Sequence, residues 1–177
     1  MIRITGGKNR SRKLLTPDTN LTKPTMDKVR AAVFNALGDD VVNKRILDLF
    51  SGSGSYGFEA LSRGASSVTF VDKQINAVKV IKANAASLNE NNVQLFNEDV
   101  LNFLSEKKGE FDIVFVDPPY KLEIYEKVLD LLEKNEYLSN DAIIVLEADN
   151  DIALDEEKYK KIKQYRYGLT KIYIMRK

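Results

Sequence analysis

Short apolar runs alternate with segments of helical character along most of the chain, and this alternation constrains the fold more than any other feature. Strands are expected at residues 46–50, 68–71, 93–96, 111–116 and 142–147, and helices at about 24–37, 57–62, 74–88, 99–106 and 123–134. Two further strands, 159–167 and 169–175, are expected to meet at Gly168. This order predicts an α/β class, with a three-layer Rossmann-like fold: a mostly parallel sheet that ends in a C-terminal antiparallel hairpin.

The first 23 residues do not follow this alternation. They contain Gly6, Gly7, several basic side chains and no clear helical period, so we expect a small basic arm or short strands, made flexible by the two glycines. Pro24 then opens the first expected helix. Because no repeat or linker interrupts the remainder, we expect one domain over residues 1–177, consisting of the arm (1–23) and a core (24–177).

A glycine-rich loop separates the expected strand 46–50 from the helix that follows it. Gly52, Gly54 and Gly57 form the pattern G-x-G-x-x-G, which lets a ligand approach the backbone at a helix N-terminus. Asp72 follows Gly52 by 20 residues, at the end of the next expected strand, where a carboxylate can bind ribose hydroxyls. The spacing indicates a nucleoside-bearing cofactor, and NAD fits this pattern as well.

A second motif, Asp117-Pro118-Pro119-Tyr120, follows the expected buried strand 111–116. It lies at the carboxyl end of a strand, where open α/β sheets bind ligands. The prolines stiffen the turn and remove two N–H donors, which leaves the Asp117 carboxylate and the Pro118 carbonyl as acceptors beside an aromatic ring. Such a corner suits a planar group that carries an NH₂.

The sequence has no Cys and no His. Disulfides, thiolate or imidazole metal ligands and Cys or His catalysis are therefore excluded, and a metal is not expected. The missing His also disfavours an NAD-dependent dehydrogenase, as do the absence of a second substrate domain and the presence of the Asp117 to Tyr120 motif. No apolar stretch has membrane-spanning length, and Met1 to Lys8 lacks the apolar core of a signal peptide, so we expect a cytoplasmic protein.

Charge is segregated along the chain although the net charge is only +1. Residues 1–30 carry +6 and residues 158–177 carry +8, whereas residues 31–157 carry −13. Basic ends on an acidic body suggest a polyanionic partner such as a nucleic acid. The alternative is that Lys160, Lys161 and Lys163 only protect an edge strand from aggregation.

Taken together, these motifs resemble the class I S-adenosylmethionine-dependent methyltransferases. Asp117 to Tyr120 is similar to the motif of enzymes that methylate the exocyclic amino groups of bases. A closer resemblance, to the bacterial guanine-N2 methyltransferases of small-subunit (16S) ribosomal RNA, rests on residues 3–8, 10–14, 24–30, 47–54 and 59–65. Lys23 and Lys28 replace the family's usual Arg, and Tyr56 stands in the glycine loop where smaller residues are common.

The resemblance implies roles for individual residues. The catalytic corner would be Asp117, Pro118, Pro119 and Tyr120. S-adenosylmethionine would be bound by Asp48 at its amino group, by Asp72 at the ribose and by the other loop and pocket residues, Ser51, Gly52, Gly54, Gly57, Lys73, Asp99 and Val100. Asp99 could also serve as a helix cap, and Asp48 and Asp72 could be structural. RNA would meet the arm at Lys8, Arg10, Arg12 and Lys13.

The implied reaction is methyl transfer to a guanine N2 in ribosomal RNA, either free or within the small ribosomal subunit or an assembly intermediate. Asp117 and the Pro118 carbonyl would each accept an N–H bond from the amino group, and Tyr120 would stack on the base. Two alternatives stay open: amino methylation of DNA adenine or cytosine, and a non-catalytic RNA-binding module. We expect a monomer, because no additional dimerisation segment is visible.

Overall fold

The structure is a computed structural model that describes residues 2–17, 24–106, 109–119 and 122–177. Its strands are β1 (Ile2–Arg3), β2 (Lys13–Leu14), β3 (Arg45–Leu49), β4 (Ser67–Val71), β5 (Val93–Phe96), β6 (Phe111–Val116), β7 (Leu138–Ala148), β8 (Lys161–Tyr167) and β9 (Thr170–Arg176). Its helices are α1 (Pro24–Leu37), α2 (Ser55–Ser62), α3 (Ile75–Leu88), α4 (Val100–Glu106) and α5 (Leu122–Lys134), with 3₁₀ turns η1 (Gly38–Val41) and η2 (Glu156–Lys158).

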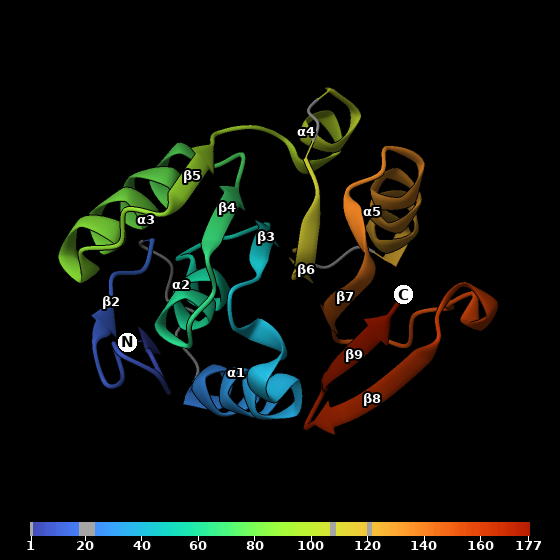
Figure 1. The fold of residues 1–177 in the computed structure, drawn as a ribbon, viewed down its shortest axis with the longest axis horizontal. Coiled ribbons are helices and arrows are strands. Elements are labelled where there is room, and N and C mark those ends of the chain that lie inside the picture. The colour runs from blue at the N-terminus through green and yellow to red at the C-terminus, as the bar shows by residue number, and fades with distance from the viewer. Residues whose placement is uncertain (1, 18–23, 107–108, 120–121) are drawn as a thin grey trace.

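Seven strands form the central sheet in the order β5-β4-β3-β6-β7-β9-β8. The first five are parallel, and β9 pairs antiparallel with both β7 and β8. Figure 1 shows the sheet running from β5, beside α3, to the C-terminal hairpin of β8 and β9. The predicted α/β fold with a C-terminal antiparallel hairpin is therefore confirmed.

Each face of the sheet packs against its own helices. Side chains such as Ile46, Ile113 and Val145 pack with α1, α2 and α3, whereas their neighbours Leu47, Val114 and Ile144 pack with α4 and α5. Successive side chains of a strand point to opposite faces, so the continuous apolar runs of the sequence supply both cores. The three layers follow from this double burial.

Local signals fix the helix ends. Pro24 occupies the first position of α1, where its missing N–H costs no hydrogen bond. Gly38 follows the last residue of α1 and has φ +56°. Asn89 ends α3 in the same left-handed region, and its N–H donates to the carbonyl oxygens of Ala85 and Ala86. No helix among the described residues is long and apolar enough to cross a membrane.

Residues 2–17 of the N-terminal arm pack against the rest of the chain, so the expectation that Gly6 and Gly7 make this segment flexible is wrong. Gly7 has φ +73°, and a Cβ on it would lie 1.8 Å from the carbonyl oxygen of Ser62 at the end of α2. The Lys8 N–H donates to the same oxygen at 2.8 Å. Gly7 thus permits close packing rather than motion, and three apolar side chains of the arm join the core: Ile2, Ile4 and Leu14.

Candidate active site

Three carboxylates end three neighbouring strands on one face of the sheet. Asp48 lies in β3, Asp117 directly follows β6, and Glu147 lies near the end of β7. The β6–β7 register pairs Val116 with Leu146, which makes Asp117 and Glu147 the next positions along the two strands. Alternation along the strands places all three side chains on the α1–α3 face, at the carboxyl edge where such sheets bind ligands.

Asp48 is the most deeply buried of the three. Its Oδ2 accepts the backbone N–H of Gly57 at 2.9 Å, so it anchors the start of α2 to β3. Burial raises the pKa of Asp48 to about 8; the Gly57 N–H opposes this shift and the charge of Asp72 adds to it. A cation placed beside Asp48 would restore its charge.

The glycine loop has one open position, Gly52, and two closed ones, Gly54 and Gly57; a Cβ on Gly54 would lie 2.8 Å from the Phe58 ring. Gly52 has φ +55°, and a Cβ there would meet only the Phe50 carbonyl oxygen, at 4.0 Å. At Gly57 a Cβ would lie 2.3 Å from the Phe70 ring, so this glycine lets α2 pack on β4. Phe50 itself has φ +57°, an uncommon conformation for a bulky residue and a mark of backbone strain at the loop.

Ser51 closes the space between β3 and β4. Its hydroxyl donates to Asp48 O at 2.5 Å or Val71 O at 3.1 Å, and accepts the Val71 N–H at 2.9 Å. The side chain predicted to bind the cofactor is therefore engaged with the backbone of both strands. Its contribution in this structure is to fix the shape of the loop.

Asp72 joins the loop after β4 to the glycine loop. Its Oδ2 accepts the Gly52 N–H at 2.8 Å, and its Oδ1 accepts the Gln74 N–H at 2.8 Å. A carboxylate accepts about four hydrogen bonds, so both oxygens retain capacity for a ligand. The neighbouring Lys73 is exposed, and its carbonyl accepts a bond from Asn97 at 2.9 Å.

Asp99 caps α4. Its Oδ1 accepts the Leu101 N–H at 3.0 Å, as a capping side chain does at the second helical position. Val100 is buried in the core on the α4–α5 face. The cap is thus present, and the half-buried carboxylate of Asp99 still has a second oxygen.

The corner after β6 combines a half-buried Asp117 with a buried Pro118 and an exposed Pro119. Burial raises the pKa of Asp117 well above its ordinary value, and the charges of Glu147, Asp48 and Asp149 add to the shift. Perturbed carboxylates at the edge of a sheet are candidates for acid–base chemistry. Tyr120, the fourth predicted catalytic residue, lies outside the described residues.

The sequence motifs did not indicate Glu147 or its partner Tyr56. The Tyr56 hydroxyl donates to Glu147 Oε2 at 2.7 Å, and the tyrosine ring stacks on Phe115 with centroids 4.9 Å apart. Burial raises the pKa of Glu147, while the Tyr56 bond opposes the shift. The signal that could have found Glu147 is its position at the end of the strand following the Asp117 motif.

All four basic arm residues are exposed, and two of them also bind residues at the end of α3. Lys8 pairs with Glu90 at 2.9 Å, and Arg12 donates to Ser87 O at 2.7 Å, so both hold the arm against α3. Arg10 and Lys13 are exposed. At the other end of the chain, Lys160 pairs with Asp141 at 3.0 Å, and both side chains are solvent-exposed.

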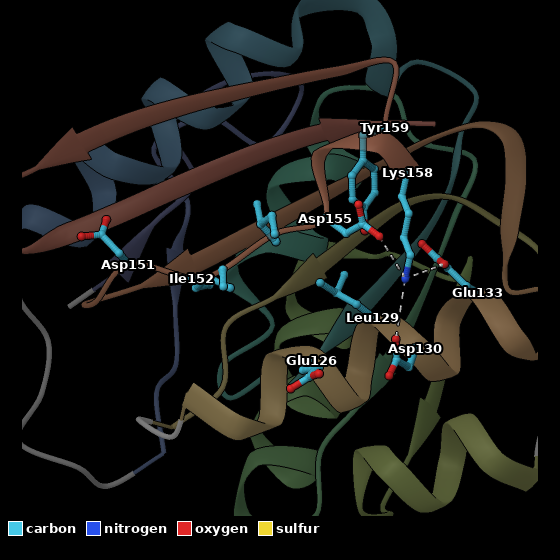
Figure 2. A pocket seen from close by; sticks show the side chains of 11 residues that line it. Glu126, Leu129, Asp130, Glu133, Asp151, Ile152, Asp155, Lys158 and Tyr159 are labelled. Carbon is cyan, nitrogen blue, oxygen red and sulfur yellow. Dashed lines mark ion pairs between the residues drawn. The ribbon is translucent and has the colours of Figure 1, made fainter.

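A large hollow lies away from the carboxylate edge, between α5 and the segment after β7. Figure 2 shows Lys158 within this pocket, paired with carboxylates of α5 and the connecting segment: Asp130, Glu133 and Asp155. Glu126 and Asp151 add further negative charge to its lining. An acidic pocket repels phosphates, so this hollow does not suit an RNA backbone.

Known proteins resemble this chain in sequence over most of its length. Residues 2–176 match the family described as conserved hypothetical protein 95. Ribosomal RNA small subunit methyltransferase D of Escherichia coli is 39% identical over 148 residues, which are 84% of this chain and 75% of the relative.

Solved structures give the same picture. An Escherichia coli protein provisionally named a methyltransferase superposes with a TM-score of 0.89 at 32% identity, covering 99% of this chain and 97% of that one. The 16S rRNA N2 G1207 methyltransferase of Thermus thermophilus, solved with AdoMet and guanosine, shares the fold. Its TM-score is 0.73 at 19% identity, over 92% of this chain and 45% of that one. The chain belongs to the conserved hypothetical protein 95 family and is related to the small-subunit ribosomal RNA methyltransferases, as the sequence motifs predicted.

Proposed function

We propose that this protein transfers a methyl group from S-adenosylmethionine to N2 of a guanine in small-subunit ribosomal RNA. Kinship with ribosomal RNA methyltransferases supports the coarser part, methylation of ribosomal RNA. The observation that carries the finer part is the Asp117 corner, where a carboxylate of raised pKa stands beside a proline carbonyl at the ligand-binding edge of the sheet. Two acceptors on a rigid turn match the two hydrogens of an exocyclic amino group.

The residues around the glycine loop fit S-adenosylmethionine. The buried Asp48 suits the cationic amino group of the methionine part, because a cation would offset the burial that raises its pKa. The open backbone at Gly52 admits close approach of a ligand, and Asp72 beside it retains acceptor capacity for ribose hydroxyls. Asp99 and Val100 lie at the start of α4, where the family resemblance expects the adenine.

When bound, S-adenosylmethionine supplies an electrophilic methyl group. The lone pair of a guanine amino nitrogen is delocalised into the ring, so the nitrogen is a poor nucleophile. Hydrogen bonds from the amino group to Asp117 and to the Pro118 carbonyl bend that group out of the ring plane, which frees the nitrogen lone pair. The same two acceptors stabilise the positive charge that develops on nitrogen. The raised pKa of Asp117 makes its carboxylate a stronger base, which suits a group that also receives the leaving proton.

The proposed RNA contacts are made by the basic arm and by Tyr120. Arg10 and Lys13 extend from an arm that packs on α2 and α3, so a phosphate backbone can meet a preformed basic surface. Tyr120 is proposed to stack on a base swung out of its helix, as aromatic side chains do in RNA recognition. The protein would act in the cytoplasm on free RNA or on the small subunit.

Nucleoside analysis by mass spectrometry tests this proposal in cells. Small-subunit RNA from cells that lack the protein should lose one N2-methylguanosine, and expression of the wild-type chain should restore it. An unchanged N2-methylguanosine content, with loss of a methylated adenine or cytosine instead, would contradict the guanine assignment. Unchanged nucleosides throughout would favour a non-catalytic RNA-binding role.

A further inference from the structure

Glu147 is the carboxylate that the proposed chemistry does not yet use. It stands on β7 beside the Asp117 corner, and neighbouring strands are about 4.8 Å apart. The side chain is half-buried, so it reaches the same edge of the sheet rather than being enclosed in the core. An acceptor on the strand beside Asp117 can contact the atom next to the amino group that Asp117 is proposed to bind.

Tyr56 holds Glu147 in place. Its hydroxyl donates to Oε2 at 2.7 Å. Its ring stacks on Phe115, and the ring of Phe34 also lies against it, with 6.3 Å between the centroids of Phe34 and Tyr56. A carboxylate accepts about four hydrogen bonds, so the Tyr56 bond leaves acceptor sites for a ligand. Tyr125 fixes the backbone of the same residue, because its hydroxyl donates to Glu147 O at 2.6 Å. The side chain and the main chain of Glu147 are thus both held, as a preorganised specificity group requires.

We propose that Glu147, oriented by Tyr56, reads the N1–H of the target guanine and so determines base specificity. This inference rests on the proposed function. Guanine presents N1–H and N2–H₂ side by side on its Watson–Crick edge, and a flipped base is read by hydrogen bonds to that edge. Asp117 and Glu147, on adjacent strands, provide two acceptors for these two donors. Adenine and cytosine present a ring-nitrogen acceptor beside their amino group, which a carboxylate disfavours.

The test replaces the target guanine of an RNA substrate by 2-aminopurine, which keeps the 2-amino group and has no N1–H. Methyl transfer (kcat/KM) and RNA affinity with S-adenosylhomocysteine present are measured for both RNAs. The wild type should prefer guanine by roughly 10- to 100-fold, the range for a hydrogen bond to a charged group. Glu147→Gln should lose most of this preference, because an amide can donate to the unprotonated N1 as well as accept from N1–H. Tyr56→Phe, which keeps the ring and removes the anchor, should lose part of it.

Asp149→Asn is the matched control, because it removes a nearby charge that also acts on Asp117. It should retain the wild-type preference. 2-Aminopurine also lacks O6, but that loss is common to all variants, so the comparison of enzyme and base substitutions isolates the Glu147 contribution. An equal preference in the wild type and Glu147→Gln would overturn the inference, as would an equal loss in Asp149→Asn. If the wild type methylates no guanine amino group, the proposed function itself fails.

Discussion

Glu59 and the three carboxylates at the strand ends lie on the same face of the sheet, and their pKa values are shifted in opposite directions. Glu59 of α2 is fully buried and surrounded by donors: Thr5 N and Oγ1 at 2.8 and 2.7 Å, Arg63 Nε at 2.8 Å and Arg30 Nε at 3.3 Å. Burial alone would raise its pKa, but the bonds from Thr5 and Arg63 and the charge of Arg30 outweigh it and lower the pKa.

At the strand ends, Asp48, Asp117 and Glu147 have raised pKa values, because burial and like charges outweigh the few donors present. A buried carboxylate whose charge is balanced by donors and cations joins the elements that supply them. A buried carboxylate without such partners lowers stability, and it is typical of a site where a ligand supplies the missing partner. Glu59 joins the arm, α1 and α2; Arg30 extends this network to Asp27 and to the carbonyl of Arg3. The contacts of Glu59 indicate a structural role, and the raised pKa values at the strand ends agree with the ligand-binding role proposed for those carboxylates.

The largest expected effect on stability is at Glu59. Glu59→Gln should lower the free energy of unfolding by about 3–5 kcal/mol, since it removes the buried negative charge that Arg30 and Arg63 share. Urea unfolding measures this loss. Lys8→Ala, which breaks a pair with an exposed lysine, should cost less than about 1 kcal/mol. Equal losses of unfolding free energy in both variants would contradict the structural role of Glu59.

The next effect concerns cofactor binding at Asp72. Asp72→Ala should weaken S-adenosylmethionine binding by roughly 1–3 kcal/mol in calorimetry, the range for leaving hydrogen-bonding groups unpaired. Because Asp72 also holds the Gly52 N–H, a cofactor analogue without ribose hydroxyls serves as the control. If the substitution weakens the analogue as much as the natural cofactor, Asp72 supports the loop and does not bind the ribose. Tight NAD binding without S-adenosylmethionine binding would overturn the cofactor assignment.

A separate effect should appear in the pH dependence of stability. The pKa of Asp48 is about 8 in the folded chain against an ordinary value of 3.8, so between these values the folded state holds a proton that the unfolded state has released. Asp48 therefore makes stability fall as pH rises from about 4 to about 8. Asp48→Asn should flatten this slope in urea unfolding at a series of pH values. Parallel slopes for wild type and variant would show that Asp48 is ionised and compensated like Glu59.

The smallest effects are expected on the basic surfaces. Neutralising the arm residues Arg10, Arg12 and Lys13 should weaken RNA binding and lower its salt slope by roughly 0.7–0.9 for each phosphate that the variant no longer neutralises. S-adenosylmethionine affinity should stay unchanged. The same change at Lys160, Lys161 and Lys163 should do less, because Lys160 already pairs with Asp141. Filter binding at several salt concentrations compares the two triple variants. A larger loss of RNA affinity in the Lys160, Lys161 and Lys163 variant would indicate that RNA binds at the C-terminal hairpin instead of the arm.

The fold was predictable because its signals are local. The expected strand 111–116 matches β6, and the expected helix 24–37 matches α1. The expected strand 142–147 is longer in the structure, where β7 begins at Leu138. A register shift between Phe111 and Ile113 extends the pairing to Leu138, and such an irregularity leaves no local pattern in either strand.

The candidate site was only partly predictable, because some of its residues belong to local motifs and others depend on contacts between distant segments. Asp48, Asp72 and Asp117 belong to motifs with fixed spacing, and the structure brings Asp48 and Asp117 to one edge on adjacent strands, with Asp72 beside the glycine loop. Glu147 has no motif, and it becomes relevant only through the pairing of β6 with β7. The docking of the arm likewise depends on distant partners, among them Asn84 of α3, which bonds both Leu15 and Ser53.

Methyl transfer by the purified chain tests the central claim most directly. Wild type and Asp117→Ala are incubated with labelled S-adenosylmethionine and unmethylated small-subunit RNA, and the modified nucleoside is identified by mass spectrometry. We predict N2-methylguanosine from the wild type. Asp117→Ala should be slower by on the order of 10²-fold or more, with cofactor affinity and stability retained. Transfer at the wild-type rate by Asp117→Ala would contradict the claim that the uncompensated carboxylates perform the chemistry.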